Sequence, residues 1–256
     1  MSRKRLVLVV LLLKIAWAQA PAYTANEIVN ASDYAPGPFA PNSVLSIFGT
    51  NLSWYTAGVT PDAVKAAVLP STLGGAEVYV DNWAAPLLYV SPSQINFIVP
   101  DNEISGPITV SVVRQGVVGP TVTVTLVEAA PALFGTGTGY AIATHADGAL
   151  LTADSPAQGG ETIVLYATGL GPTQPNPDPG AIPPRAATML YLSSLSVSLD
   201  GLALPSFRIK YAGLTPLSAG LYQINIELPP DVGTDPAIQV TVGTQSDSDG
   251  LKIAVQ

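Results

Sequence analysis

The sequence predicts an all-β protein built from two tandem β-sandwiches and one short helix. Three observations support this prediction. Short apolar runs alternate with a period of two, 23 Gly and 24 Pro separate the runs, and a set of motifs occurs twice in the same order. Such runs, bounded by turn residues, are typical of half-buried strands. Charged residues make up 11% of the 256 positions, against about 25% in an average soluble protein, which argues against a disordered polyelectrolyte or a coiled coil.

The N-terminus predicts an export signal over residues 1–18. A basic segment, Arg3–Arg5, precedes the apolar run Leu6–Leu13 and the small-x-small site Ala16–Ala18, which together are typical of a secretory signal. The apolar run is too short for an ordinary transmembrane helix. We expect cleavage after Ala18, with cleavage after Ala20 as the alternative. The expected location is therefore secreted, extracellular or at the cell surface, with the periplasm as an alternative.

Removal of this signal changes the charge of the protein. It leaves 6 Lys and Arg against 18 Asp and Glu, a net charge of −12 instead of −8. A surface of this sign repels nucleic acid and anionic membranes, so we expect neither as a partner, and no membrane insertion after signal removal. The chain has no cysteine, which excludes disulfides, thiolate zinc sites and Cys nucleophiles.

Twelve runs are predicted to be strands because apolar and polar residues alternate along them. In chain order they are Val44–Phe48, Ala76–Val80, Leu87–Val90, Ile95–Val99, Ile108–Val113, Val122–Val127, Ile163–Ala167, Leu195–Leu199, Phe207–Tyr211, Tyr222–Leu228, Ile238–Val242 and Leu251–Val255.

Turn and cap residues predict one hairpin and the short helix. Asp147-Gly148 lies between two apolar segments, as in a tight hairpin turn. Thr60 offers an N-cap ahead of Pro61, and the following residues favour a helix near residues 61–69, which Pro70 ends.

Four motifs recur in the same order along the chain. The pairs are Ile47–Leu52 with Leu165–Leu170, Val78–Pro86 with Val197–Pro205, Gln94–Pro100 with Gln223–Pro229, and Val122, Val124 and Leu126 with Leu251, Ile253 and Val255. Each repeat has the size of an immunoglobulin-like sandwich, which has about 100 residues. We therefore expect a first immunoglobulin-like unit, with an N-terminal extension, at residues 19–130 and a second at residues 131–256.

The duplicated motifs contain the residues expected to hold the fold together. These structural motif residues are Gly49, Asn51, Gln94, Asn96, Gly169, Gln223 and Asn225. In each Gln-Ile-Asn segment, strand alternation places the two amides on the face opposite the isoleucine. We expect the amides to satisfy backbone groups in a neighbouring loop, and a polar binding strip is the alternative.

Several segments resemble the uncharacterised C-terminal domain of many secreted proteins of soil acidobacteria, of the Solibacter type. They are Asn30–Ser32, Ala40–Leu52, Leu73–Gly75, Ala85–Asn96, Ala130–Phe134, Leu165–Pro172, Tyr211–Gly213 and Gly220–Asn225. The Gly49–Leu52 element is also similar to that of IPT/TIG immunoglobulin-like domains. The resemblance implies tandem immunoglobulin-like sandwiches, and the family has no established activity or catalytic residues to carry over.

The sequence offers little for catalysis. His145 is the single histidine, so a Ser-His-Asp arrangement would have to use it, with Asp147, Asp154 and Ser155 nearby. Its turn context predicts an exposed, solvated side chain, and no Gly-x-Ser-x-Gly motif occurs. The acidic residues lie mostly in turns, which explains them without a glycosidase carboxylate pair. We therefore predict that the protein is not an enzyme, with a hydrolase as an alternative.

No cofactor is expected, but acidic loops favour hard cations. Ser246–Gly250 and Asn176–Gly180 each offer oxygen ligands, although neither matches a twelve-residue EF-hand loop. Asp247 and Asp249 are the candidate ligands of a structural calcium site.

Four aromatic residues of the first unit are the candidate ligand-binding residues: Trp54, Tyr55, Trp83 and Tyr89. They fall in or beside predicted loops, where an exposed row could stack on a sugar or a protein. The alternative is that they plug a core or the contact between the two units.

These observations favour an exported, non-enzymatic structural or adhesive protein of the cell surface or extracellular matrix. Its partners would be a protein or a polysaccharide at the cell surface, with self-association as a further expectation. One alternative is a carbohydrate-binding module that uses the aromatic residues of the first unit. Another is a self-assembling filament subunit, which would need an unpaired, uncharged edge strand.

Overall fold

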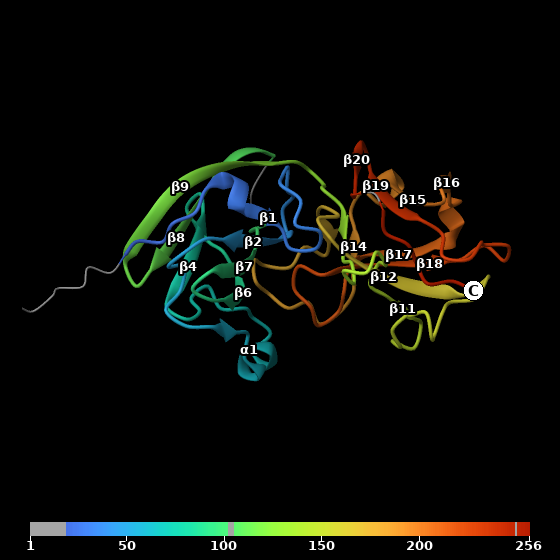
Figure 1. Cartoon of the computed structure of the whole chain (residues 1–256), viewed down its shortest axis with the longest axis horizontal. Helices are drawn as coiled ribbons and strands as arrows, with labels where there is room; N and C mark the ends of the chain where they lie inside the picture. The colour runs from blue at the N-terminus through green and yellow to red at the C-terminus, as the bar shows by residue number, and fades with distance from the viewer. Residues whose placement is uncertain (1–18, 102–104, 249) are drawn as a thin grey trace, which may run out of the picture.

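The computed structural model describes residues 19–101, 105–248 and 250–256, and Figure 1 shows them as two halves joined end to end. The predicted signal, residues 1–18, lies outside the described residues. Nearly all regular structure in the described part is antiparallel β-strand, so the predicted all-β fold class is confirmed. Among the described residues, no helix is long and apolar enough to cross a membrane.

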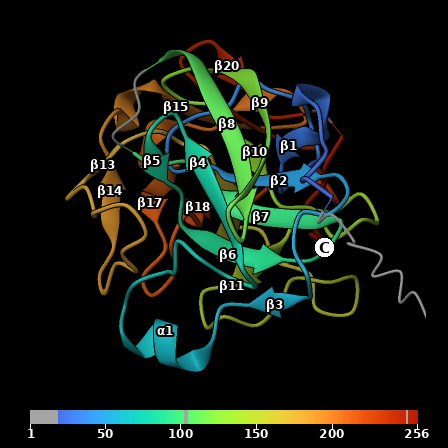
Figure 2. The same cartoon turned by 90° about the vertical axis from the view of Figure 1, so that its left-hand side faces the viewer.

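The first half contains two sheets. One has the order β1-β2-β7-β6-β3 and the other the order β5-β4-β8-β9. In Figure 2, β8 and β9 run across the direction of β2, β6 and β7. The strands are β1 (Ile28–Asn30), β2 (Val44–Phe48), β3 (Ala57–Gly58), β4 (Ala76–Val80), β5 (Trp83–Ala84), β6 (Leu87–Val90), β7 (Gln94–Ile98), β8 (Gly106–Arg114) and β9 (Val117–Leu126), with a 3-10 turn, η1 (Ala25–Glu27), before β1.

The second half repeats this plan. A larger sheet has the order β10-β12-β18-β17-β14-β13 with β11 also paired to β12, and a smaller sheet has the order β16-β15-β19-β20. The elements are β10 (Ala132–Leu133), β11 (Ala143–His145), β12 (Thr162–Thr168), β13 (Thr173–Gln174), β14 (Ala187–Met189), η2 (Leu192–Ser194), β15 (Leu195–Leu199), β16 (Leu202–Ala203), η3 (Ser206–Arg208), β17 (Ile209–Leu214), β18 (Tyr222–Glu227), β19 (Ile238–Val242) and β20 (Gln245–Ser246).

Each half has its own apolar core. One core is formed by side chains from Tyr23 to Leu126, the other by side chains from Ala129 to Val255. Strands β4, β15 and β19 bury every second residue, as expected when one face of a sheet packs on a core and the other meets water.

Short strands such as β1, β10 and β14 lie outside every predicted run, and β9 begins five residues before its predicted start. Three further predicted elements differ from the structure. The helix α1 spans only Pro61–Lys65, because Ala67 adopts a left-handed φ of 56° that a continuing helix does not allow. Residues 206–208 form a 3-10 turn ahead of β17. The run Leu251–Val255 is not a strand; isolated bridges such as Ala157 to Val255 hold it against the second core.

The duplicated motifs share their backbone geometry. Asp81 and Asp200 have φ angles of 47° and 50° at equivalent hairpins. Each carboxylate accepts a backbone N–H from the adjacent strand, from Thr109 at 2.7 Å and from Ala237 at 2.9 Å. Each Asp thus adopts the left-handed turn conformation and also satisfies a backbone N–H of another part of its sheet, which explains why an Asp occurs at both turns.

The two halves meet along a packed junction. A third cluster, Val44, Leu69, Ile98 and Ile182, draws its buried side chains from both halves. Backbone hydrogen bonds also cross over, since Leu69 donates to Gly180 at 2.8 Å and Ile182 donates to Ala67 at 2.9 Å. The left-handed turn at Ala67 that ends α1 therefore provides part of the junction.

Thr168 lies at the centre of this contact and is fully buried. Its hydroxyl accepts the backbone N–H of Val44 in the first half at 3.0 Å and donates to the carbonyl of Gly220 in the second half at 3.2 Å. The two halves approach so closely here that position 220 requires glycine, because a Cβ on Gly220 would lie 2.9 Å from the Val44 side chain.

Candidate functional site

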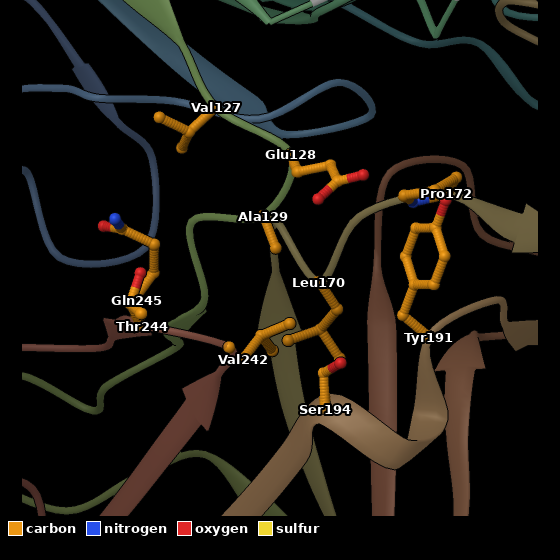
Figure 3. Close-up of a pocket in the computed structure, with 11 residues that line it drawn as sticks. Val127, Glu128, Ala129, Leu170, Pro172, Tyr191, Ser194, Val242, Thr244 and Gln245 are labelled. Atoms are coloured by element: carbon orange, nitrogen blue, oxygen red, sulfur yellow. The ribbon is translucent and has the colours of Figure 1, made fainter.

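A hollow of about 450 Å³ opens where the segment linking the two halves crosses the second half. Figure 3 shows the residues that line it. The linker supplies Val127, Glu128 and Ala129, the loop after β12 supplies Leu170 and Pro172, the segment around η2 supplies Tyr191 and Ser194, and the end of β19 with its turn supplies Val242, Gly243, Thr244 and Gln245. We call it the junction hollow.

Two glycines bring the loop after β12 against the linker. Gly169 has a φ of +74° and Gly171 a φ of +90°. A Cβ on Gly169 would lie 2.1 Å from the carbonyl oxygen of Ala130, and one on Gly171 would lie 2.9 Å from that of Glu128. Both positions thus demand glycine, for the backbone conformation and for the space.

Backbone hydrogen bonds fix the other walls of the junction hollow. The N–H of Leu190 donates to the carbonyl of Pro172 at 2.8 Å, which holds the Tyr191 segment beside the loop. The N–H of Gly243 donates to the carbonyl of Ser194 at 2.9 Å. The lining side chains are therefore held by main chain that is anchored before any ligand arrives.

The junction hollow combines polar groups with an apolar floor. Glu128, Ser194, Thr244 and Gln245 offer a carboxylate, hydroxyls and an amide, while Leu170, Ala129 and Val242 are apolar. In Figure 3 the Glu128 carboxylate and the Tyr191 ring lie toward the same side of the opening, and Gln245 lies toward the other. No Lys or Arg is among the described residues that line it. Such a set can accept and donate hydrogen bonds to a neutral polar ligand, but offers no cation for an anionic one.

A smaller hollow of about 240 Å³ shares Glu128 and Pro172 with the junction hollow. It also contains Asp101, and burial raises the pKa of that carboxyl, with a hydrogen bond from Asn176 acting in the opposite direction. The Asp101 carboxyl therefore takes up a proton more readily than an exposed aspartate does.

Trp54, Tyr55 and Trp83, predicted either to plug a core or to bind a ligand, are exposed, at 48%, 60% and 57%. Trp54 packs its ring 4.0 Å from the guanidinium of the buried Arg114 and donates its indole N–H to Gln115 at 2.9 Å. The core-plug alternative is wrong for these three side chains. The remaining candidate, Tyr89, is half-buried.

The exposed indoles do not lie next to one another. Trp54 contacts Arg114, which pairs with Ala76 at the start of β4, whereas Trp83 pairs with Val80 at its end. At a rise of about 3.3 Å per residue, this places the two indoles on the order of 13 Å apart along the sheet. Trp83 and its repeat counterpart Leu202, 76% exposed, occupy matching hairpins of the two halves.

The amides of each Gln-Ile-Asn segment bond to one another. The Nε2 of Gln94 donates to the Oδ1 of Asn96 at 2.8 Å, and Gln223 donates to Asn225 in the same way at 3.0 Å. Ser46 on the paired strand also donates to Asn96, at 2.9 Å. These bonds run along and across strand faces, so the expectation that the amides serve the backbone of a neighbouring loop is wrong for them.

The remaining motif residues are placed by backbone constraints. A Cβ on Gly49 would lie 2.4 Å from the carbonyl oxygen of Ala22. Asn51 adopts a left-handed φ of 58°, matching Gly169 at the equivalent position of the second half.

Of the two calcium candidates, Asp247 is buried and Asp249 lies outside the described residues. Asp247 accepts the backbone N–H of Val240 at 2.9 Å, so its carboxylate serves strand β19. Among the described residues, no group of three or more His, Asp or Glu could hold a metal ion. The calcium site stays a prediction.

His145 is not the solvated turn side chain that its sequence context predicts. Its Nδ1 lies 2.5 Å from the Oε1 of Glu161, and its Nε2 lies 3.2 Å from both the carbonyl and the hydroxyl of Ser155. The hydrogen bond with Glu161 raises the pKa of the imidazole. The hydrogen bonds of the ring therefore tie the turn after β11 to the loop before β12, and none of the described hollows includes it.

Together these features define an immunoglobulin-like β-sandwich protein with a hollow at its packed junction that combines polar groups with an apolar floor. Residues 31–127 match the family model described as the IPT/TIG domain, which places a domain of that family in the first half. No curated protein matches the chain. The resemblance to the C-terminal domain of secreted acidobacterial proteins stays a prediction.

Solved structures are similar at low sequence identity. A surface glycan-binding protein of Prevotella bryantii is 13% identical with a TM-score of 0.29, over 92% of this chain and 42% of that one. A glycan-binding protein of the Bacteroides ovatus mixed-linkage glucan utilization locus, in complex with a heptasaccharide, is 9% identical with a TM-score of 0.33, over 95% and 47%. The extracellular region of plexin A4 is 13% identical with a TM-score of 0.31, over 92% and 15%. The chain thus spans less than half the length of each.

Proposed function

We propose that the protein is an exported, non-enzymatic immunoglobulin-like binding protein with a structural or adhesive role at the cell surface or in the extracellular matrix. In this proposal the junction hollow takes a neutral, hydroxyl-rich ligand, such as a segment of a polysaccharide. The observation that carries it is the lining of the junction hollow: one carboxylate, one tyrosine ring, and hydroxyl and amide groups around an apolar floor.

The chemistry of the lining favours a sugar over other ligands. Glu128 can accept hydrogen bonds from ligand hydroxyls, and the ring of Tyr191 can pack on the C–H face of a pyranose. An anionic ligand would meet Glu128 without a compensating Lys or Arg in the described lining, in a protein of net charge −12 after signal removal. A purely apolar ligand would leave the carboxylate desolvated and unpaired.

The packed junction supports binding without rearrangement. Because Thr168 and the bonds between residues 67–69 and 180–182 hold the halves together, the walls of the junction hollow are held before binding. A preformed site loses less conformational entropy when the ligand binds.

Titration calorimetry with a panel of soluble neutral polysaccharides tests the proposal. We expect binding to at least one, weakened about tenfold or more in Glu128→Gln and Tyr191→Ala. Trp54→Ala and Trp83→Ala are the matched controls, because both remove exposed aromatic side chains that do not line the junction hollow, and they should bind as the wild type. Absence of binding across the panel, or unchanged affinity in both junction variants, would overturn the assignment.

A second candidate site is the exposed aromatic set of the first half. The exposure of Trp54, Tyr55 and Trp83 favours it. It predicts the opposite pattern in the same titrations. Trp54→Ala and Trp83→Ala should lose binding, and Glu128→Gln should bind as the wild type does. Their separation along β4 means that one ligand touching both indoles would have to be an extended chain.

A further inference from the structure

The segment that follows the predicted signal is anchored to the first half. Ala22 exchanges two backbone hydrogen bonds with Thr50, both of 2.9 Å. The hydroxyl of Tyr23 accepts the backbone N–H of Val112 at 2.8 Å. Pro21 and Tyr23 are buried. Residues 21–23 are therefore part of the fold.

Gln19 extends this anchor through both its main chain and its side chain. The Nη2 of Arg114 donates to the carbonyl of Gln19, and the Nδ2 of Asn51 donates to its Oε1 at 3.3 Å. Arg114 is buried, its Nε has no hydrogen-bond partner, and no Asp or Glu of the described chain forms an ion pair with it. The carbonyl of Gln19 thus accepts from a buried cation that has no carboxylate partner, so losing this acceptor is costly.

These contacts discriminate between the two cleavage positions that the sequence leaves open. Cleavage after Ala20 would remove Gln19 and take this acceptor from Arg114. It would also place the charged amine of a new N-terminus on Pro21, which is buried, and a buried charge without a partner is unfavourable. Cleavage after Ala18 keeps both contacts and starts the chain at Gln19, which is exposed.

A glutamine at an N-terminus can react with itself. Its α-amine attacks the side-chain carboxamide, so that the N–Cδ bond forms and the Cδ–Nε2 bond breaks. One amine hydrogen passes to Nε2, which leaves as ammonia, and no oxidant or reductant takes part. The product is pyroglutamate, a five-membered lactam without charge. The attacking amine must be unprotonated, and negative charge develops on Oε1 as the bond forms.

We propose that the mature chain begins at Gln19 and that this residue is a modification site, where the α-amine closes on the side-chain carboxamide to form pyroglutamate. The cation of Arg114, bonded to the carbonyl of the same residue, disfavours a second positive charge on the amine. The Nδ2–H of Asn51 stabilises the charge that develops on Oε1.

The cyclised residue fits the contacts that Gln19 already makes. The lactam keeps both the main-chain carbonyl and Oε1, so the hydrogen bonds from Arg114 and Asn51 persist in the product. Only the charged terminus beside Arg114 is lost. The proposal rests on the export in the proposed function, but it does not depend on the junction hollow.

Mass spectrometry of the exported protein tests both parts of the proposal. The full chain is expressed with its own signal in a bacterial host and recovered from outside the cytoplasm. We expect the intact mass of residues 19–256 less one ammonia, and fragmentation should place the loss on the first residue. Gln19→Ala is the control, because it should be cleaved at the same position and show no loss of ammonia.

The rate of closure tests the contact with Asn51. A fusion cut immediately before residue 19 releases the folded chain with a free amine, and mass spectrometry then follows the loss of ammonia. Asn51→Gly should cyclise about fivefold more slowly and fold normally, because Gly169 occupies the equivalent position of the second half. Gln115→Gly is the matched control. It also removes an amide at positive φ, but that amide bonds to Trp54, so it should cyclise as the wild type does.

An exported chain that begins at Pro21 overturns the proposal, and so does one that begins at Gln19 and keeps a free amine. Equal rates in the wild type and Asn51→Gly would refute the role given to Asn51. A chain retained inside the cell at full length would refute the export itself, and its mass distinguishes that failure from the other two. Failure of the polysaccharide titrations would change none of these masses.

Discussion

Replacing the buried hydroxyl of Thr168 should weaken the link between the two halves. Thr168→Val keeps the shape of the side chain but leaves the N–H of Val44 and the carbonyl of Gly220 without this partner. Each buried group left unsatisfied costs about 1–3 kcal/mol, so the two cost about 4 kcal/mol together. The methyl group of valine that replaces the hydroxyl is buried, and its burial restores about 1 kcal/mol of stability. We expect the free energy of unfolding to fall by about 3 kcal/mol.

Urea denaturation followed by circular dichroism measures this loss. If the free energy of unfolding falls by about 3 kcal/mol per molar urea, the unfolding midpoint should be lower by about 1 M urea. Thr168→Ser is the control, because it keeps the hydroxyl, removes one methyl and should cost about 1 kcal/mol. If Thr168→Val costs less than Thr168→Ser, the hydroxyl does not hold the halves together, and the account of the junction is wrong.

Three further predictions concern other contacts. Glu161 raises the pKa of His145 in the folded protein. The ion pair between them therefore contributes its full stability at pH values below about 6.5, the pKa of histidine in the unfolded chain. That stability is lost as pH rises through the raised folded pKa; thermal melts should show this fall in the wild type and not in His145→Gln. Gly169→Ala should lower the free energy of unfolding by about 3 kcal/mol or more, since strain at positive φ adds to a clash with the linker. Gly148→Ala is the control, because Gly148 has a similar φ but open space around it. It should lower the free energy of unfolding by about 1–2 kcal/mol in the same melts. Burial raises the pKa of Tyr23 to about 12. In a titration followed by near-ultraviolet absorbance, Tyr23→Phe should therefore lack one of the phenols that ionise late. If the variant instead lacks a phenol that ionises near pH 10, the side chain of Tyr23 is not buried.

Local sequence information was sufficient for most of the fold. Alternation located the longer strands of both sandwiches, because a half-buried strand must alternate. It missed short strands such as β1, β10 and β14, which have only two or three residues. The duplicated Asp81 and Asp200 turns could also be predicted, since the φ requirement is local to a hairpin. The N–H groups that their carboxylates bind could not, because Thr109 and Ala237 lie 28 and 37 positions further along the chain. The helix was predicted too long because the turn at Ala67 is selected by its bond to Ile182, far along the chain.

The candidate site depends on contacts that local patterns do not encode. The linker at Glu128 and the segment at Tyr191 are more than 60 positions apart, and only the packing of Gly169 and Gly171 against the linker brings them together. His145 was misassigned for the same reason, because its partner Glu161 approaches only through the pairing of β11 with β12. One usable signal was overlooked: glycines immediately before and after Leu170 indicate a close backbone approach.

The junction also determines how the molecule would respond to tension. Strands β12 and β18 are joined over six residue pairs. The halves, in contrast, share scattered hydrogen bonds, at Thr168, from Ala130 to Gly169, between residues 67–69 and 180–182 and from Ser248 to Asp33, and one small apolar cluster. A force that pulls the ends apart would therefore separate the halves before it unfolds either sandwich. The linker would then extend between the separated halves while both cores stay folded, so the molecule could lengthen and return without unfolding.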